Sequence, residues 1–221
     1  MKITKRKKFK LVNQNNLMIE SKKAIKQLNE LEKLTSKETR LAAEGWNKNW
    51  KTLIAIMMSA QTRDTKTIEV CERLFKKYNS LKKLSNAKLE EIEKEIKSIN
   101  YYKTKAKNII EISKILLEKK VRYEFDELIK LPGIGRKTAN VYLAEVKKEN
   151  RIGVDTHVYR ISRKLNWANS NTREKVEQDL IKLFPEKYHY KINYILVRFG
   201  QTYGKSSKKE DLILEKIKTI V

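Results

Sequence analysis

Interruptions of the helical pattern are rare in this sequence, and that scarcity limits the folds open to the chain more than any other feature. Only two prolines and six glycines occur in 221 residues. Apolar side chains recur at the three- and four-residue spacing of amphipathic helices, and alternating β-branched runs are scarce. We therefore predict an all-α protein, with helices over about residues 20–34, 37–44, 50–59, 64–78, 86–96, 102–119, 124–130, 136–148, 156–165, 171–182, 187–202 and 208–220.

One segment is apolar almost without interruption and predicts the centre of the core. It contains Leu53, Ile54, Ile56, Met57 and Met58. Cys71 is the only cysteine, and it falls on the apolar face of the next predicted helix, where a small core residue is expected. A single cysteine excludes an intramolecular disulfide and a metal site made of cysteines alone.

The charge balance indicates a polyanionic partner. There are 51 Lys and Arg against 27 Asp and Glu, a formal net charge of +24. Nucleic acid is the first candidate and an anionic membrane surface the second. Residues 1–18 are basic without a clear period, so we expect a flexible basic tail. No apolar run approaches the roughly 20 residues of a membrane helix, and none follows the basic start as in a secretory signal. We expect a soluble cytoplasmic protein.

The stretch LIKLPGIGRKTANVYLAEV, residues 128–146, predicts a hairpin between two helices. Pro132 ends the first helix, and Gly133 and Gly135 permit backbone angles and close approaches that other residues forbid. Ile134 is expected to anchor the turn in the core. Backbone N–H groups at the start of the next helix then face outward, where a phosphate oxygen can accept from them, with Arg136 adding charge. An ordinary tight helix–helix turn is the alternative.

Lys137 is a candidate nucleophile because it follows this turn directly. The positive end of a helix dipole and neighbouring cations disfavour the protonated amine, which leaves a nucleophilic neutral form. A solvated surface lysine is the alternative.

Asp155 is a candidate catalytic carboxylate. In the run Ile152 to Val158 it opens a new helix, which it can cap with one oxygen while the other faces a cleft. A purely capping role is the alternative. His157 could orient a phosphate or Asp155, or simply pack. A carboxylate stabilises oxocarbenium character on a sugar, and an amine that attacks the anomeric carbon gives a Schiff base open to β-elimination.

Four segments in this order and spacing resemble the endonuclease III branch of the helix-hairpin-helix (HhH-GPD) DNA glycosylase superfamily. They are LIAIMMSAQTRD (53–64), INYYKTKAKNI (99–109), LPGIGRKTAN (131–140) and VDTHVYRISRKL (154–165). The resemblance covers roughly residues 20–203. It implies a six-helix domain over residues 40–149, a second helical domain made of residues 19–39 and 150–221, and an active site between them.

The resemblance also implies roles for single residues. The family's catalytic lysine and aspartate fall on Lys137 and Asp155. Gln61 matches the residue that fills the gap left by a flipped nucleotide, and Tyr101 stands where the family uses an apolar wedge. Leu131, Gly133, Gly135, Arg136 and His157 complete the predicted DNA-binding set. The implied partner is double-stranded DNA with damaged bases or abasic sites. No feature of the sequence indicates an oligomer, so we expect a monomer.

The sequence departs from the family at its C-terminal end. The four cysteine positions that hold a [4Fe–4S] cluster in endonuclease III fall on Gly204, Asp211, Leu214 and Ile220. We therefore predict no cofactor. In place of the cluster, KKEDLILEKIKTI (208–220) predicts an amphipathic helix with apolar contacts from Leu212, Ile213, Leu214 and Ile217.

The leading prediction is a bifunctional glycosylase and apurinic/apyrimidinic (AP) lyase that acts on oxidised pyrimidines such as thymine glycol. A mismatch uracil or thymine glycosylase, or an 8-oxoguanine enzyme, would use the same scaffold. A non-catalytic DNA-binding module is the third possibility, and the paired Lys137 and Asp155 argue against it. A metal-dependent nuclease is disfavoured because no Asp, Glu and His cluster has ligand spacing.

Overall fold

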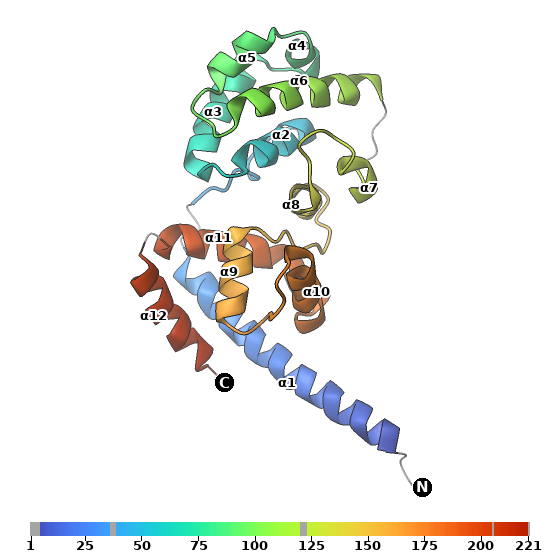
Figure 1. The fold of residues 1–221 in the computed structure, drawn as a ribbon, viewed down its shortest axis with the longest axis vertical. Helices are drawn as coiled ribbons and strands as arrows, with labels where there is room; N and C mark the ends of the chain where they lie inside the picture. Colours follow the sequence, from blue (N-terminus) through green and yellow to red (C-terminus); the bar gives the residue numbers. More distant parts are fainter. Residues whose placement is uncertain (1–4, 36–38, 120–122, 205, 221) are drawn as a thin grey trace. The chain divides into compact units, whose positions relative to one another are not determined.

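The computed structural model describes residues 5–35, 39–119, 123–204 and 206–220, with side chains from residue 17 onward. Within these ranges the regular structure is helical and contains no strand, which confirms the all-α prediction (Figure 1). None of the described helices combines the length and apolar character that crossing a membrane requires.

The chain divides into two compact units. One is continuous and comprises residues 38–153, and the other is split, made of residues 1–37 and 154–221. We call them the continuous unit and the split unit. The two-domain organisation with bounds at residues 40 and 149 stays a prediction.

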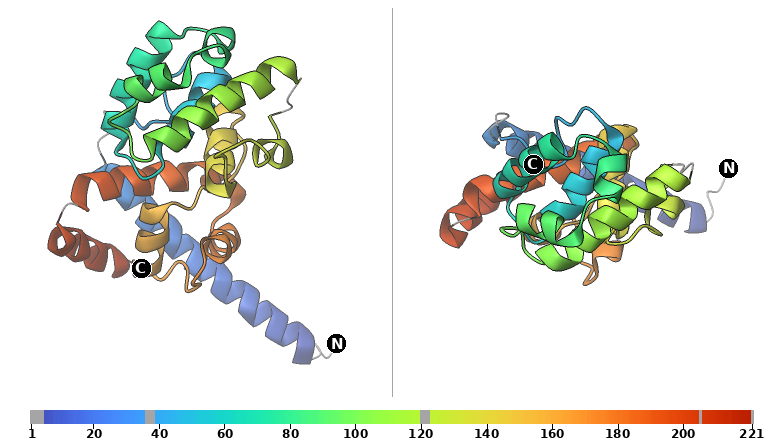
Figure 2. Two further views of the ribbon diagram at one scale, coloured as in Figure 1. Left: turned by 45° about the horizontal axis from the view of Figure 1, so that its top comes forward. Right: turned by 90° about the horizontal axis from the view of Figure 1, so that it is seen from above.

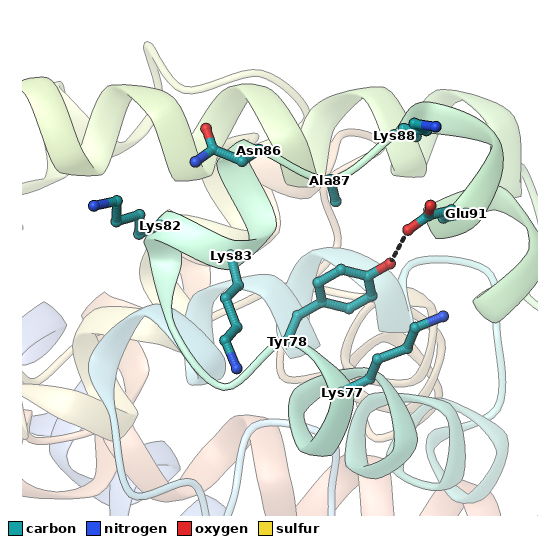
Figure 3. A pocket seen from close by; sticks show the side chains of 8 residues that line it. All are labelled: Lys77, Tyr78, Lys82, Lys83, Asn86, Ala87, Lys88 and Glu91. Carbon is teal, nitrogen blue, oxygen red and sulfur yellow. Dashed lines mark hydrogen bonds between the residues drawn. The ribbon is translucent and has the colours of Figure 1, made fainter.

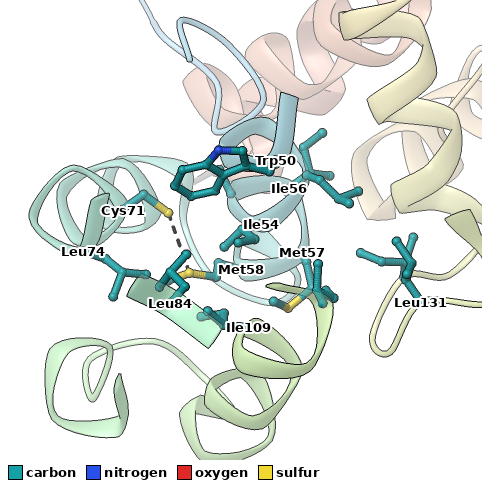
Figure 4. Close-up of a cluster of buried hydrophobic side chains, with 14 of the residues drawn as sticks. Trp50, Ile54, Ile56, Met57, Met58, Cys71, Leu74, Leu84, Ile109 and Leu131 are labelled. Carbon is teal, nitrogen blue, oxygen red and sulfur yellow. Dashed lines mark hydrogen bonds between the residues drawn. The ribbon is translucent and has the colours of Figure 1, made fainter. Parts of the chain in front are cut away.

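The continuous unit is built around one buried helix, α2 (Asn49–Ser59). Every side chain from Leu53 to Met58 is at most 2% exposed, as the apolar segment predicts. Figure 4 shows this helix amid the core, with Cys71 close to Met58. Cys71 is fully buried, also as predicted, and burial raises the pKa of its thiol far above the ordinary range. The other helices of this unit are α3 (Asp64–Lys77), α4 (Leu81–Ser85), α5 (Leu89–Glu95), α6 (Tyr102–Glu118), α7 (Phe125–Leu128) and α8 (Arg136–Val146).

The split unit joins helices from the two ends of the chain. It contains α1 (Lys5–Leu34), α9 (Thr156–Lys164), α10 (Arg173–Leu183), the short 3-10 helix η1 (Glu186–Tyr188), α11 (His189–Tyr203) and α12 (Ser207–Lys218). Helix α11 packs against both α9 and α1 (Figure 2). Buried Gln27 of α1 accepts from Trp167 Nε1 at 2.7 Å and donates to the carbonyl of Ile217 at 3.2 Å. One amide side chain thus ties the N-terminal helix to two distant parts of the unit.

Two predictions about local structure are wrong, and one helix is missing from the prediction. Residues 5–18 are helical rather than a loose tail, because α1 begins at Lys5; residues 1–4 lie outside the described residues. Residues 39–44 form a turn and not a helix, closed by Arg40 Nε, which donates to the carbonyl of Glu44 at 2.9 Å. The other end of that predicted helix, residues 37 and 38, is not described. The short helix α4 was not predicted at all.

Candidate active site

The predicted hairpin lies between α7 and α8 in the continuous unit. Ile134 is 3% exposed, which confirms it as the anchor of the turn, and its N–H donates to the carbonyl of Leu131 at 3.1 Å. Leu131 itself is 5% exposed, so its side chain belongs to the core, and its predicted part in DNA binding stays a prediction. Gly133 has a φ of +74°, and a Cβ there would collide with the side-chain amide of Asn108. Only glycine fits that position without strain.

Gly135 differs from Gly133: the special backbone angle predicted for it is wrong, whereas the predicted close approach of its backbone to a ligand stays a prediction. Its φ of −93° and ψ of 176° suit any residue, and a Cβ added there would meet no atom within 4 Å. It caps the N-terminus of α8 with its backbone alone. Within the described ranges no hydrogen bond engages the backbone N–H of Gly135 or of Lys137. The hairpin therefore offers unsatisfied donors on an open face, the arrangement that binds an oxyanion.

Lys137 is the second residue of α8, in its first turn as predicted. Its side chain is half-buried, and Nζ makes no hydrogen bond or ion pair with the described part of the chain. Arg136 is exposed beside it, with its guanidinium 5.2 Å from the centre of the Phe125 ring, and Arg151 approaches the same ring at 5.1 Å. A reactive amine at this position would follow Arg136 directly in the chain and lie at the positive end of a helix.

Asp155 caps α9 in the split unit. Its Oδ1 accepts from the N–H of Val158 at 2.8 Å, which fixes the rotation of the carboxylate. The described residues supply no hydrogen bond to Oδ2. The cap therefore uses one oxygen and leaves the other for a ligand, so capping and catalysis are compatible in one side chain.

His157 packs inside the split unit. Its Nδ1 lies 3.3 Å from Arg160 Nη2, and a Cβ on Gly200 of α11 would collide with its ring. Of the two roles considered for His157, this environment supports packing. The DNA-binding role stays a prediction.

Gln61 and Tyr101 lie on two turns that the structure brings together. Both have left-handed backbones, with φ of 57° and 59°, and both side chains are exposed, Tyr101 at 64%. The side-chain amide of Asn100 donates to the carbonyl of Gln61. Asn100 N–H donates to Thr62 Oγ1 at 3.3 Å.

Sequence reasoning missed three polar residues around the site: Asn100, Lys105 and Asn140. Asn140 is 1% exposed, and its Nδ2 donates to the carbonyl of Ile152 at 3.0 Å, which holds α8 against the segment that leads to Asp155. A signal for Lys105 was present: it shares one helical face with Ile109 and Ile112, so the pattern places a charge in an apolar stripe.

The C-terminal helix α12 does not offer the ligands of an iron–sulfur cluster. Gly204, Leu214 and Ile220 have no donor atom, and Asp211 Oδ1 is bonded to Lys164 Nζ at 2.5 Å. A [4Fe–4S] cluster is held by thiolates, so the residues present do not fit it.

Glu210, and not the predicted Leu212, takes a core position on α12. Leu212 is 66% exposed, whereas Glu210 is 1% exposed because it shares a face with Leu214 and Ile217. Its carboxylate pairs with Arg160 and, at 3.0 Å, with Lys164, both on α9. The prediction of an apolar contact by Leu212 is therefore wrong.

A separate groove of about 560 Å³ lies between the C-terminal end of α3 and helix α4 (Figure 3). Four lysine side chains line it, and Tyr78 donates to Glu91 Oε2 at 2.9 Å on one side. None of the candidate site residues contributes to it. The lining residues are Lys77, Tyr78, Lys82, Lys83, Asn86, Ala87, Lys88 and Glu91.

Comparison with known proteins identifies the family. The model of the HhH-GPD superfamily of base excision DNA repair proteins matches residues 54–186. Endonuclease III of Thermotoga maritima is 42% identical over 155 residues, which are 69% of this chain and 73% of the relative. The Bacillus subtilis endonuclease III is 38% identical over 160 residues, 70% of this chain and 72% of the relative.

Solved structures of endonuclease III and of a related glycosylase resemble this protein in fold. A trapped endonuclease III–DNA covalent intermediate superposes with a TM-score of 0.77 at 33% identity, covering 85% of this chain and 89% of that one. A thermostable thymine-DNA glycosylase shares the fold with a TM-score of 0.70 at 16% identity. From the family match and these relatives, the chain belongs to the endonuclease III branch of the HhH-GPD superfamily of base excision DNA repair proteins.

Proposed function

We propose that this protein is a DNA glycosylase and AP lyase that removes oxidised pyrimidines from duplex DNA, with Lys137 as nucleophile and Asp155 as the acidic partner. The observation that carries the proposal is the hairpin itself. It presents unsatisfied backbone donors next to a lysine amine that has no partner among the described residues. An oxyanion cradle and a free amine side by side suit attack on a sugar whose phosphate is held by the hairpin.

The proposed reaction begins with a neutral Lys137 amine. Its nitrogen bonds to the anomeric carbon of the flipped nucleotide, while the glycosidic bond breaks and the base leaves with the electron pair and a proton. The Asp155 carboxylate stabilises the positive charge that develops on the sugar. Ring opening gives a Schiff base, and loss of a proton from the adjacent carbon expels the 3′ phosphate. Water then hydrolyses the Schiff base and regenerates the amine.

Duplex DNA as the partner is supported by charge and by kinship. The chain carries a formal net charge of +24, and the structures it resembles at 33% identity are endonuclease III–DNA complexes. A sequence-independent clamp on the backbone is what the hairpin provides, while the identity of the lesion must be read by the pocket that receives the flipped base. We expect the protein to act as a monomer.

Borohydride trapping tests the chemistry. Two duplexes are used, one with a single thymine glycol and one with an abasic site. We expect a covalent adduct on both, absent in Lys137→Gln and retained in Lys147→Gln, which removes an exposed lysine from the other end of α8. An adduct on the abasic duplex alone would keep Lys137 and reject the oxidised pyrimidine. No adduct on either duplex would refute the lyase.

We further propose that Glu210, through its ion pairs with α9, holds the C-terminal helix α12 in place where relatives use the cluster. Burial lowers the pKa of Arg160, which marks this pair as partly desolvated, where breaking one partner is costly. Because the side chains of Arg160 and Lys164 are 35% and 34% exposed, water compensates part of the loss. Glu210→Gln should lower the free energy of unfolding by about 1–3 kcal/mol, whereas Glu215→Gln, exposed on the same helix, should leave it unchanged. Iron analysis of the purified protein is the independent check, and about four irons per chain would refute the proposal that it holds no [4Fe–4S] cluster.

A further inference from the structure

Lys105 is a buried cation for which the proposed chemistry has no use. It lies in α6, is 6% exposed, and belongs wholly to the continuous unit. Its Nζ donates to the carbonyl of Met58 and to the carbonyl of Ala60, each at 2.7 Å. Burying a lysine costs several kcal/mol unless its donors are satisfied, so a buried lysine with two carbonyl acceptors has a defined structural task.

That task is visible in how α2 ends. The last carbonyls of a helix have no partner within the helix. Here the N–H of Ala60 bonds to Met57 and the N–H of Thr62 bonds to Ser59. These two backbone bonds do not use the carbonyls of Met58 and Ala60, and both carbonyls accept hydrogen bonds from Lys105 Nζ. Its positive charge also lies at the negative end of the α2 dipole.

The chain that leaves this cap leads directly to Gln61. Gln61 follows Ala60 in a left-handed conformation, a strained choice for a residue other than glycine that surrounding bonds must hold. Its carbonyl accepts from the side chain of Asn100, which directly precedes Tyr101. The N–H of Lys105 itself bonds to the carbonyl of Tyr101 at 3.0 Å. Lys105 therefore bonds the Tyr101 turn with its backbone and the Gln61 turn with its side chain.

We propose that Lys105 is a positioning residue that locks the Gln61 turn to the Tyr101 turn, so that both exposed side chains enter the DNA at a lesion as one preformed unit. The inference rests on the proposed function, in which these two residues contact a duplex with a flipped nucleotide. A preformed pair of probes binds more tightly than two separate mobile turns, because little conformational entropy remains to be lost when DNA binds.

Burial lowers the pKa of Lys105 to about 8, and the lock does not depend on the charge alone. A neutral amine still has two N–H groups, as many as there are carbonyls to satisfy. The one titratable side chain that shifts this pKa by its charge is the Cys71 thiol, whose own pKa burial raises far above the ordinary range. The cap accordingly survives deprotonation and is lost only when the amine is removed.

The test compares binding of full-length variants to two duplexes. One carries a tetrahydrofuran abasic analogue, which the enzyme cannot cleave through a Schiff base, and the other is undamaged. We expect Lys105→Met to weaken binding to the abasic analogue about tenfold and binding to undamaged DNA less than twofold. Lys107→Met, which removes an exposed lysine from the same helix, is the matched control and should change neither.

A double-mutant cycle separates positioning from general destabilisation. In a Gln61→Ala, Tyr101→Ala background, Lys105→Met should cost less than twofold, because the side chains that it positions are gone. An equal tenfold loss in both backgrounds would overturn the inference. Asn100→Ala breaks the same link from an exposed position, so it tests the lock even if Lys105→Met fails to fold. Unchanged binding of the abasic analogue by that variant would also overturn it.

Failure of the inference and failure of the proposed function give different results. If the unmodified protein shows no preference for the abasic analogue and forms no borohydride adduct, the proposed function is wrong. If the unmodified protein shows both and Lys105→Met behaves in the same way, the function stands and the lock is wrong.

Discussion

The two glycines of the hairpin should respond in opposite ways to the same substitution. In Gly133→Ala the new methyl group meets Asn108 at a φ of +74°. The left-handed backbone costs an alanine roughly 1–2 kcal/mol, and displacing a packed neighbour adds about 1–3 kcal/mol. The free energy of unfolding should therefore fall by about 2–5 kcal/mol, which lowers Tm by roughly 4–20 °C for a chain of this size.

Gly135→Ala should leave stability almost unchanged and weaken DNA binding. The methyl group meets no atom within 4 Å, and the backbone angles are ordinary, so the expected change in unfolding free energy is under about 0.5 kcal/mol. The same methyl would stand where a phosphate oxygen approaches the hairpin. Loss of one hydrogen bond to a charged oxygen is worth about 1.5–3 kcal/mol, or roughly 10- to 150-fold in Kd.

Urea unfolding and fluorescence anisotropy with an undamaged duplex measure the two quantities on the same preparations. We expect Gly133→Ala to lose stability, and Gly135→Ala to lose DNA affinity without losing stability. If Gly135→Ala binds DNA as tightly as the unmodified protein, no backbone approaches the DNA at that point and the hairpin is only a structural turn.

Three further predictions concern charge. Asp155→Asn keeps an oxygen for the α9 cap, so stability should change by less than about 1 kcal/mol while base removal slows roughly 100-fold or more; single-turnover kinetics decide, and full activity would remove Asp155 from the mechanism. The logarithm of DNA affinity should fall with the logarithm of salt concentration by about 0.9 per phosphate contacted. Arg136→Gln should make that slope shallower by about the same amount, and an unchanged slope would show that Arg136 contacts no phosphate. Burial lowers the pKa of Lys105 to about 8, below that of an unfolded lysine, so the unfolded chain binds more protons between about pH 8 and 10.5. Stability relative to Lys105→Met should therefore rise with pH across that window in urea unfolding, and a flat difference would contradict the pKa.

The features that the sequence predicts well are those set by neighbouring residues. An apolar run six residues long has no place outside a core, and the order Pro132, Gly133, Ile134 can hardly continue a helix. For the same reason the sequence locates the first turn of α8 and the cap at Asp155.

The features that it misses depend on distant partners. Glu210 shares a helical face with Leu214 and Ile217, but the partners that compensate its buried charge, Arg160 and Lys164, lie some 50 residues earlier in the chain. The spacing alone therefore could not show that a glutamate would be tolerated in the core. Lys105 is one of 51 basic residues, and only the ending of α2 reveals its purpose. Residues 5–18 lack an apolar period, yet they are helical, because a helix already anchored downstream extends at little cost.

The single thiol in the interior of the continuous unit makes the local opening of that unit measurable. Cys71 is fully buried, and its raised pKa leaves almost no thiolate at neutral pH. A thiol reagent can therefore modify the folded protein only when that unit opens, and the rate of modification reports the free energy of opening. Since the sequence has no other cysteine, the signal has no background. DNA that binds only the closed form would slow the modification in proportion to its occupancy, so ligand affinity can be read as protection of a single sulfur atom.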